Sequence, residues 1–267
     1  MTARGGSDTG SQEMREMDGI LFDIKQLAIH DGPGLRTTVF FKGCPLRCRW
    51  CHNPEGLSPA PQLMYKKTSC THCGLCRKPC THEECRPFGR CLHICPNNLL
   101  TVSGRRIGAE ELAARLARIN RISHGGVTFS GGEPLMQAAF LKDLIPLIRS
   151  FVHDLAIETS GYADPSVFHE ITEEMDHIFM DIKLADPSMH REHTGVSNEL
   201  ILQNLTSLYG RTNVTIRTPL IPGITDTPEN LSAIKKLIRD LPHELLPYNE
   251  FSPVKYEMLG MEYPLKR

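Results

Sequence analysis

Short apolar runs alternate along the chain with segments whose apolar side chains repeat at helical spacing. The runs TTVFF, VTF, LAIET, HIFMDI and VTIRTPLI are continuous and rich in β-branched residues, which is typical of strands buried on both faces. Segments that keep one apolar face are predicted to be helices, at about residues 110–120, 135–148, 199–209 and 228–240. Because strand and helix alternate about six times, we expect a parallel α/β sheet with right-handed crossovers, as a full or partial barrel or an open doubly wound sheet.

One stretch, from about Tyr65 to Val102, breaks this pattern. Cysteine, proline, histidine and basic residues replace the apolar repeat there, so we predict a module held by ligands rather than by a core. The start of the chain is rich in Gly, Ser and charge, which is typical of a disordered leader. The predicted organisation is a leader (1–18), a main α/β unit (19–64 and 102–267) and an inserted module (65–101).

The charges of the chain are balanced, with 30 Lys and Arg against 31 Asp and Glu. This balance gives no overall electrostatic case for binding nucleic acid or an anionic membrane. No uninterrupted apolar run approaches the length of about 18 residues that a membrane span needs, and the N-terminus lacks the apolar core of a signal peptide. We therefore expect a cytoplasmic protein without a nucleic-acid or membrane partner, and we expect it to be a monomer.

All ten cysteines lie between Cys44 and Cys95. Because the cytosol keeps thiols reduced, this clustering indicates metal binding rather than disulfides. The stretch CPLRCRWC contains three of them, Cys44, Cys48 and Cys51, on a loop after a predicted strand, where their thiolates can converge on one centre. A structural zinc site or a simple electron-carrying cluster normally has four ligands, so a zinc knuckle here would need Cys70 or a histidine as well.

The Cys-x3-Cys-x2-Cys spacing, with the aromatic Trp50 before the last cysteine, resembles the signature of the radical S-adenosylmethionine enzymes. More segments resemble one family within that group, the glycyl-radical enzyme activating enzymes, which include the pyruvate formate-lyase activating enzyme. These segments, over residues 19–263, are DGPGLRTTVFFKGCPLRCRWCHNPE, GGVTFSGGEPLMQ, IETSGY, DIKLAD, HTGVSN, IRTPLIPG and LLPY. The resemblance implies a partial (β/α)6 TIM-like barrel with a small inserted ferredoxin-like iron–sulfur module.

The resemblance also implies a reaction. Cys44, Cys48 and Cys51 would hold a 4Fe-4S cluster whose fourth iron is chelated by the amino and carboxylate groups of S-adenosylmethionine. An electron from a flavodoxin- or ferredoxin-type donor would cleave this cosubstrate into methionine and a 5′-deoxyadenosyl radical, which takes a hydrogen from a backbone glycine of a partner glycyl-radical enzyme. In the family, Asp31 and Arg36 of DGPGLR help to hold the glycine-bearing loop of that partner. The cofactors carry the chemistry and the protein positions them.

Further matched positions are implied to bind the cosubstrate. The segment SGGEP would bind the amino group of the methionine moiety, and polar residues at later strand ends would share the C-terminal mouth of the barrel. A carboxylate and two cations there suit a zwitterionic cosubstrate. The residues assigned to cofactor binding in this way are Trp50, His52, Gly131, Gly132, Glu133, Thr159, Asp181, Ile182, Lys183, Arg217 and Asn249.

Two positions depart from the family pattern. Glu158, with Thr159 and Asp181, matches the residues around a monovalent cation, but relatives have aspartate where Glu158 stands. Asn249 stands where relatives have a histidine that contacts the nucleoside. Its amide can still form hydrogen bonds, but it cannot stack as an imidazole ring does and it does not titrate.

The inserted module contains a ferredoxin-like run of cysteines. In CTHCGLCRKPC the spacing is two, two and three residues, as in bacterial ferredoxins, where the fourth cysteine serves the other cluster. Ferredoxin pairing then predicts one complete auxiliary iron–sulfur cluster, on Cys70, Cys73, Cys76 and Cys95. The second site would have Cys80, Cys85 and Cys91, because Phe88 takes the place of its fourth ligand.

That second site is open at this stage. It could hold a 3Fe-4S cluster, a 4Fe-4S cluster completed by His82, His93 or an exogenous ligand, or no cluster. The auxiliary iron could transfer electrons, help to dock a partner, or staple a module too small to fold by packing alone.

Two other functions are kept as alternatives. The first is a radical S-adenosylmethionine enzyme that acts on a small molecule or peptide of its own. The second is a non-catalytic iron–sulfur electron carrier, which the ferredoxin-like run permits. In an electron carrier, the GGE segment and the strand-end charges would have no function. Failure to bind S-adenosylmethionine would favour the electron carrier.

Overall fold

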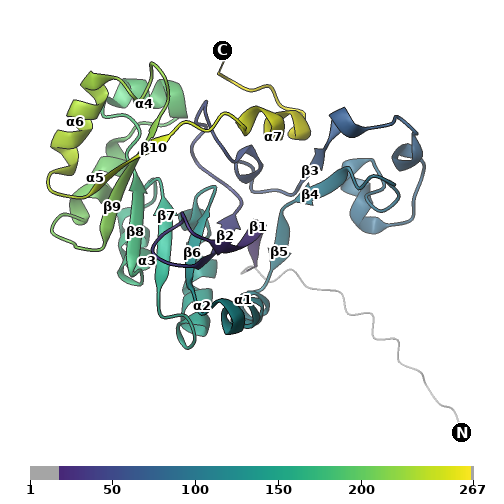
Figure 1. Ribbon diagram of the computed structural model, residues 1–267, viewed down its shortest axis with the longest axis horizontal. Helices are drawn as coiled ribbons and strands as arrows, with labels where there is room; N and C mark the ends of the chain where they lie inside the picture. Colours follow the sequence, from purple (N-terminus) through teal and green to yellow (C-terminus); the bar gives the residue numbers. More distant parts are fainter. Residues whose placement is uncertain (1–17, 266–267) are drawn as a thin grey trace, which may run out of the picture.

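The computed structural model of the chain describes residues 18–265, and all but the last residue of the predicted leader lies outside them. Its main feature is an eight-stranded sheet with the order β10-β9-β8-β7-β6-β2-β1-β5 (Figure 1). The strands of this sheet are β1 (Gly19–Ala28), β2 (Arg36–Phe41), β5 (Arg105–Ile107), β6 (Gly126–Gly131), β7 (Leu155–Thr159), β8 (His177–Asp181), β9 (Val214–Leu220) and β10 (His243–Pro247).

Six of these strands are parallel. β2 and β6 to β10 run in one direction, whereas β1 pairs antiparallel with β2 and with β5 at one edge. The predicted parallel α/β sheet is confirmed. Because β10 and β5 are the two edges of this sheet, it is an open sheet rather than a closed barrel, and the ends of its parallel strands are brought to one side.

Six of the seven helices in residues 18–265 lie between strands along the chain, and the seventh, α7, follows the last strand. The helices are α1 (Ala109–Ser123), α2 (Ala138–Arg149), α3 (Pro165–Glu173), α4 (Pro187–Thr194), α5 (Glu199–Ser207), α6 (Pro228–Ile238) and α7 (Ser252–Leu259). Three of them begin at a side-chain cap followed by proline. Asp164, Asp186 and Thr227 each accept a hydrogen bond from a backbone N–H of the first turn, and the next residue is a proline whose missing N–H costs the helix nothing.

The core lies between the sheet and helices α1, α2, α3, α5 and α6. Leu112 and Leu116 of α1 are buried, as are Leu141, Leu144 and Ile148 of α2. They belong to one core with strand residues such as Val127 and Phe129. The predicted helical faces are therefore the faces that pack. Helices at about 110–120, 199–209 and 228–240 are confirmed within a few residues, while the segment after Pro134 starts as a 3-10 turn, η5 (Pro134–Gln137).

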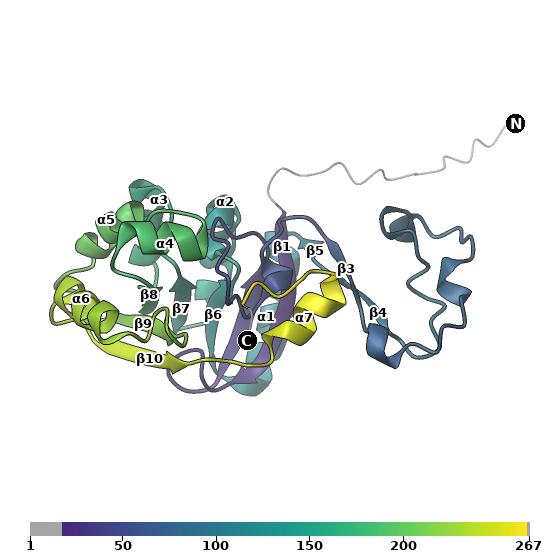
Figure 2. The same cartoon turned by 90° about the horizontal axis from the view of Figure 1, so that it is seen from above.

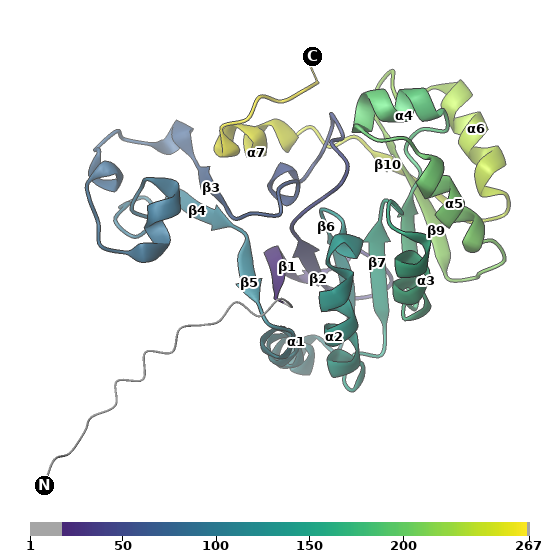
Figure 3. The same ribbon diagram turned by 180° about the vertical axis from the view of Figure 1, so that it is seen from behind.

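The insertion is carried by a two-stranded hairpin beside the main sheet. β3 (Gln62–Tyr65) pairs antiparallel with β4 (Leu100–Ser103), with Tyr65 opposite Leu100. Figures 1 and 3 show the chain between them, residues 66–99, standing away from the sheet. Its regular structure is limited to the 3-10 turns η2 (Lys67–Ser69), η3 (Leu75–Arg77) and η4 (Glu83–Phe88). This agrees with a module that has little apolar packing.

The last helix bridges the main unit and the hairpin. α7 lies between β10 and β3 (Figure 2) and packs against η1 (Pro54–Gly56). Lys255 on α7 donates hydrogen bonds to Asn53 (2.8 Å) and to Glu55 (2.7 Å), which fixes the helix over the loop that follows β2. Within residues 18–265, no helix combines the length and the apolar character needed to cross a bilayer.

Candidate functional site

The loop after β2 carries the first three cysteines and is held at both ends by backbone bonds. Gly43, at φ 92°, turns the chain sharply out of β2, and its N–H bonds to the carbonyl of Gly56 at 2.8 Å. Further along, Arg47 N–H bonds to the carbonyl of Thr194 at 2.6 Å and Arg49 N–H to that of His193 at 3.0 Å. The last carbonyls of α4 therefore fix the part of the loop that contains Cys48.

The GGE segment at the end of β6 clamps the same loop. The N–H of Gly132 bonds to the carbonyl of Phe41, and that of Glu133 to the carbonyl of Gly43, both at 2.8 Å. A Cβ on Gly132 would lie 2.3 Å from the Gly43 oxygen, and one on Gly131, at φ 117°, would lie 2.3 Å from the Phe41 nitrogen. Only glycine allows two backbones to approach so closely, so these glycines position the cysteine loop.

The side chain of Glu133 does not face the cavity that the sequence assigns to it. It is fully buried and accepts four hydrogen bonds, from Thr159 Oγ1 (2.8 Å), Leu135 N (3.2 Å), Ser160 N (2.8 Å) and Ser160 Oγ (2.5 Å). Burial raises the pKa of this carboxyl, and the hydrogen bonds oppose that shift. Glu133 thus joins the end of β6 to the end of β7, and any contact of this turn with a ligand falls to the backbone.

A cavity of about 370 Å³ opens at the C-terminal ends of the parallel strands. It brings together most of the residues that the sequence assigns to the site, from six separate segments of the chain. Those that line it are Cys44, Cys48, Trp50, Cys51, His52, Gly131, Gly132, Thr159, Asp181, Lys183, Arg217 and Asn249. The expected shared mouth of the sheet is therefore present.

The three thiols line this cavity, where Cys48 is buried and Cys44 and Cys51 are half-buried. Burial is the main cause that raises the pKa of Cys44 to about 12, with the charge of Glu133 adding to it, and burial likewise raises the pKa of Cys48 and Cys51. Thiols with a raised pKa lose their protons and bind as thiolates only where a cationic metal centre offsets the free-energy cost of their negative charge. Three such donors at one cavity fit a three-cysteine iron–sulfur cluster with one open iron.

Two cations stand across the cavity, each paired with a carboxylate. Lys183 Nζ donates to Asp181 Oδ2 at 2.7 Å; burial alone would lower the pKa of Lys183, but Asp181 and Cys48 raise it overall. Arg217 donates to Glu158 at 2.5 Å and to Glu244 at 2.8 Å, and its guanidinium stacks 3.8 Å from the centre of the Phe179 ring. Both side chains stay charged and nearly buried, as a site for a carboxylate ligand requires.

Glu158 is already engaged within the protein. Besides Arg217, it accepts a hydrogen bond from Ser130 Oγ at 2.5 Å. Its longer arm, compared with aspartate, reaches across to the guanidinium of Arg217 on β9. The carboxylate that the resemblance places beside a monovalent cation therefore has an arginine as its counter-ion in this chain.

Asn249 lines the cavity, but its side-chain oxygen has a local partner. Oδ1 accepts a hydrogen bond from the N–H of Phe251 at 2.9 Å, which forms a turn immediately before α7. The backbone carbonyl of Asn249 also accepts from Ser252 Oγ at 3.2 Å. Asn249 therefore helps to start α7 at the rim of the cavity.

Two residues assigned from the sequence have other places in the structure. Ile182 packs in the main core with 1% of its surface exposed, and its N–H bonds to the carbonyl of Arg217 at 2.9 Å. Alternation along β8 explains this, because Asp181 and Lys183 point to the opposite side. The side chain of Ile182 is therefore a core residue, and the expectation that it lines the cavity is wrong.

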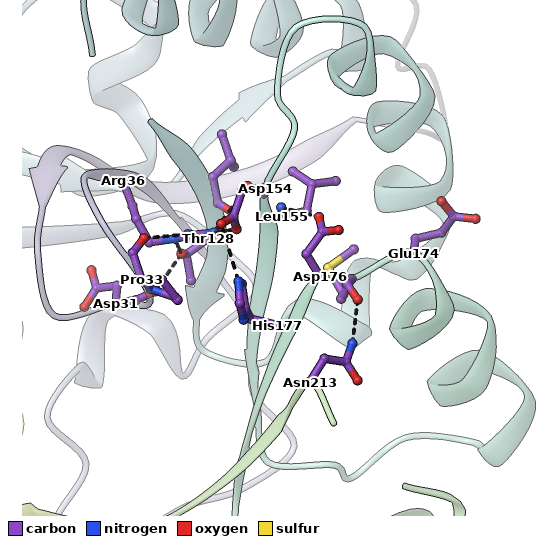
Figure 4. Close-up of polar contacts among 12 residues, drawn as sticks. Asp31, Pro33, Arg36, Thr128, Asp154, Leu155, Glu174, Asp176, His177 and Asn213 are labelled. Atoms are coloured by element: carbon purple, nitrogen blue, oxygen red, sulfur yellow. Dashed lines mark hydrogen bonds and ion pairs between the residues drawn. The ribbon is translucent and has the colours of Figure 1, made fainter. Parts of the chain in front are cut away.

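Arg36 is also buried, at the other end of the sheet (Figure 4). Its guanidinium donates to Thr128 Oγ1 (2.7 Å), the Pro33 carbonyl (3.0 Å) and the Val127 carbonyl (3.1 Å), and pairs with Asp154 at 2.8 Å. With every donor group engaged and none of its surface exposed, it cannot contact a partner as the sequence suggested. Arg36 instead ties the loop before β2 to β6.

The partner contact of Asp31, in the same loop, stays a prediction. Asp31 is half-buried; its Oδ2 accepts from Thr38 Oγ1 at 2.5 Å and its carbonyl from Thr128 Oγ1 at 2.7 Å. The sequence reasoning also missed cavity residues whose types carry no obvious chemistry, namely Leu46, Asn53, Ser130, Ser160, Pro219, Ile221, Leu246, Pro247, Tyr248 and Ser252. Ser130 and Ser160 could have been predicted from the sequence, because Ser130 lies near the end of the apolar strand β6 and Ser160 directly follows the apolar strand β7.

The insertion holds a second cavity, of about 190 Å³, framed by cysteines. Four of its lining residues are those that ferredoxin pairing predicts for one auxiliary cluster, Cys70, Cys73, Cys76 and Cys95. Two donors already point at the sulfurs: Arg90 Nη1 lies 3.2 Å from Cys76 Sγ and the His72 N–H lies 3.3 Å from Cys70 Sγ. Donors of this kind stabilise cluster thiolates, so the set fits an iron–sulfur cluster.

The remaining three cysteines form a separate group. The ligand atoms of Cys80, Cys85, Cys91 and His82 all lie within 4.8 Å of one another. His93 is not part of this group, because its Nε2 bonds to Glu84 at 2.9 Å. Of the two histidines that the sequence left open, the structure thus places His82 with the cysteines.

Comparison with known proteins adds the following. The family model described as the radical SAM superfamily matches residues 38–233. The 4-hydroxyphenylacetate decarboxylase activating enzyme of Clostridioides difficile (strain 630) is 34% identical, over 93% of this chain and 88% of that protein. The choline trimethylamine-lyase activating enzyme of Oleidesulfovibrio alaskensis is 37% identical, over 95% and 91%. The structure of Streptococcus suis SuiB bound to precursor peptide SuiA shares the fold, with a TM-score of 0.51, 12% identity and coverage of 81% of this chain and 39% of that one.

Proposed function

The chain belongs to the radical SAM superfamily and, within it, to the activating enzymes of glycyl-radical enzymes, and on this premise we propose that it activates a partner glycyl-radical enzyme. The observation that carries the proposal is that three cysteine thiols, a glycine turn and paired strand-end charges line one cavity. When bound there, the 4Fe-4S cluster and S-adenosylmethionine supply the radical that takes a hydrogen from a backbone glycine of the partner.

The residues of the chain bind and orient these cofactors. Cys44, Cys48 and Cys51 supply three thiolates, and the clamp between Gly132 and the loop carbonyls fixes the direction from which they approach the cluster. Lys183 and Arg217 offer charged donors to the carboxylate of the cosubstrate from strands β8 and β9. The apolar side of the same cavity suits the nucleoside.

The resemblance also implies a site for a monovalent cation. Glu158, Thr159 and Asp181 are the matching positions, and Glu158 and Asp181 each have a cationic side chain against them already, Arg217 and Lys183. Because Glu158 and Asp181 already have these cationic partners within the protein, we propose that neither carboxylate needs a monovalent cation beside it. Cosubstrate binding should then be the same in sodium, potassium and bulky organic-cation buffers.

The partner is a glycyl-radical enzyme, and its substrate is not fixed by similarity. Relatives named for 4-hydroxyphenylacetate decarboxylase, choline trimethylamine-lyase and isethionate sulfite-lyase are 34%, 37% and 37% identical to this chain. Such similar values do not distinguish among these partners. We further propose a flavodoxin- or ferredoxin-type electron donor and a monomeric enzyme in the cytoplasm, with one auxiliary cluster in the Cys70 set supporting the exposed insertion.

The experiment that tests the proposal is anaerobic turnover. The reconstituted and reduced protein is given S-adenosylmethionine, and 5′-deoxyadenosine is measured by chromatography, with and without a candidate glycyl-radical enzyme, whose radical is measured by electron paramagnetic resonance. We expect 5′-deoxyadenosine and a glycyl radical in near-equal amounts, and neither with Cys48→Ala. The matched control is Cys73→Ala, in the insertion, which leaves the three cavity thiols intact.

Two other outcomes would favour a different function for the chain. 5′-Deoxyadenosine without a glycyl radical on any candidate partner would favour an enzyme acting on a substrate of its own. A full iron load without cosubstrate binding would refute the proposal and favour an electron carrier.

A further inference from the structure

The group formed by Cys80, His82, Cys85 and Cys91 lies in the insertion, apart from the two cavities. Local backbone structure brings its members together. The 3-10 turn η4 starts after His82, and the N–H of Cys85 bonds to the His82 carbonyl at 3.2 Å, so the two side chains stand one turn apart on the same side. Gly89, at φ 61°, ends the turn and reverses the chain, which returns Cys91 to the same place.

The spacing of the ligand atoms favours a single metal ion over a cluster. With zinc bonds of about 2.3 Å to sulfur and about 2.0 Å to nitrogen, a tetrahedral site separates its ligand atoms by about 3.5 to 3.8 Å. Here Cys91 Sγ lies 3.8 Å from His82 Nδ1, and all four atoms lie within 4.8 Å. A 4Fe-4S cube carries its ligands on four different irons and so needs them further apart.

The surroundings of the group are those of metal-bound thiolates and imidazole. Cys85 and Cys91 are 2% and 3% exposed, and the N–H of Leu92 lies 3.3 Å from Cys85 Sγ, as a donor to a thiolate does. The ring of His82 lies 4.6 Å from that of His93, whose Nε2 bonds to Glu84. This ring contact holds His82 with its Nδ1 toward the cysteines. His93 and Glu84 thus act as residues behind the ligands, of the kind that orient metal-binding side chains.

We propose that Cys80, His82, Cys85 and Cys91 bind one structural zinc ion in a Cys3His site, next to a single auxiliary iron–sulfur cluster on the Cys70 set. Three thiolates and one imidazole in tetrahedral arrangement are a common structural zinc set. The two sites share the backbone bond from Cys91 N–H to the Cys76 carbonyl, 2.8 Å long, so zinc binding also braces the cluster loop. Because zinc has no redox chemistry, the insertion then has one electron-carrying centre.

The first test needs no variant and no catalytic assay. The full chain is reconstituted without oxygen in excess ferrous iron and sulfide together with one equivalent of zinc, and bound metals are counted. We expect about one zinc and about eight iron per chain, the iron for two 4Fe-4S clusters. X-ray absorption at the zinc edge should show three sulfurs at about 2.3 Å and one nitrogen at about 2.0 Å. Absent zinc with about twelve iron, or zinc bound by oxygen or by four sulfurs, overturns the proposal.

Variants then identify the imidazole. His82→Ala should bind zinc at least tenfold more weakly, since one of four ligands is lost, while the matched variant His93→Ala keeps the ion. His82→Cys should keep zinc with four sulfurs and serves if His82→Ala does not fold, because it preserves a four-ligand set. Retention by His82→Ala of a three-sulfur, one-nitrogen zinc spectrum would show that another residue is the ligand and would overturn the assignment.

Discussion

Replacing Glu133 by glutamine tests whether this residue joins two strands or binds a ligand. In the native protein its two oxygens accept four donors, two of which are the backbone N–H groups of Leu135 and Ser160. Whichever way a glutamine amide is turned, its NH2 group faces one of these N–H groups, and an unpaired buried donor costs about 1–3 kcal/mol. The burial that raises the carboxyl pKa is relieved in the amide, so we expect a net loss of unfolding free energy of about 1–3 kcal/mol.

The assay combines stability with kinetics. Unfolding by guanidinium is followed by circular dichroism on the reconstituted protein under anaerobic conditions, and Glu199→Gln, at an exposed position on α5, is the matched control. Because the end of β7 is displaced relative to the GGE turn, the rate of 5′-deoxyadenosine formation should fall at least tenfold, with little change in the Km for S-adenosylmethionine. Unchanged stability with a raised Km would refute the reasoning, since it would place the carboxylate against the ligand.

Three further predictions follow from buried groups. Burial lowers the pKa of His190 below 6.5, so the folded protein disfavours its protonation. Stability should therefore fall as the pH drops below about 6.5, because the unfolded chain binds the extra proton; unfolding curves from pH 5 to 8 should show a flatter dependence for His190→Gln than for the native protein, and an equal slope would contradict this. Arg36→Met should cost about 3–5 kcal/mol of unfolding free energy, since it leaves carbonyls and a carboxylate without their donor; a loss no larger than that of the exposed Arg118→Met would contradict this. Gly132→Ala, whose Cβ meets the Gly43 oxygen at 2.3 Å, should cost about 1–3 kcal/mol and abolish 5′-deoxyadenosine formation, and normal turnover would show that the clamp is dispensable.

The strand-end residues could be predicted from the sequence because parallel strands share one direction. Once VTF, LAIET, HIFMDI and VTIR are strands of one sheet, Thr159, Asp181 and Arg217 must meet at its C-terminal edge, and they do. Ile182 was misplaced because a motif covers both faces of a strand, while only alternate residues reach the cavity. Arg36 was misplaced because nothing in DGPGLR shows which end of the sheet the loop faces.

Other features depend on contacts between segments far apart in the chain. Apart from the Pro33 carbonyl, the acceptors of Arg36 lie about 90 residues or more away, in β6 and before β7, and no local pattern encodes them. In the insertion, cysteine spacing predicted the Cys70 set because ferredoxin loops repeat a fixed local geometry. The position of His82 depends instead on the turn η4 and the reversal at Gly89. Spacing alone could not choose between His82 and His93.

The hairpin that carries the insertion makes residues 66–99 easy to remove or exchange, by protein engineering or in evolution. Because Tyr65 and Leu100 are paired, residues 66–99 leave and rejoin the main unit at one point. A short turn could close β3 onto β4 and leave the sheet order, the cysteine loop and α7 in place. The insertion is thus a cassette: we expect that residues 66–99 can be removed from this chain, or transplanted into a relative that lacks them, without a change in the fold of the main unit.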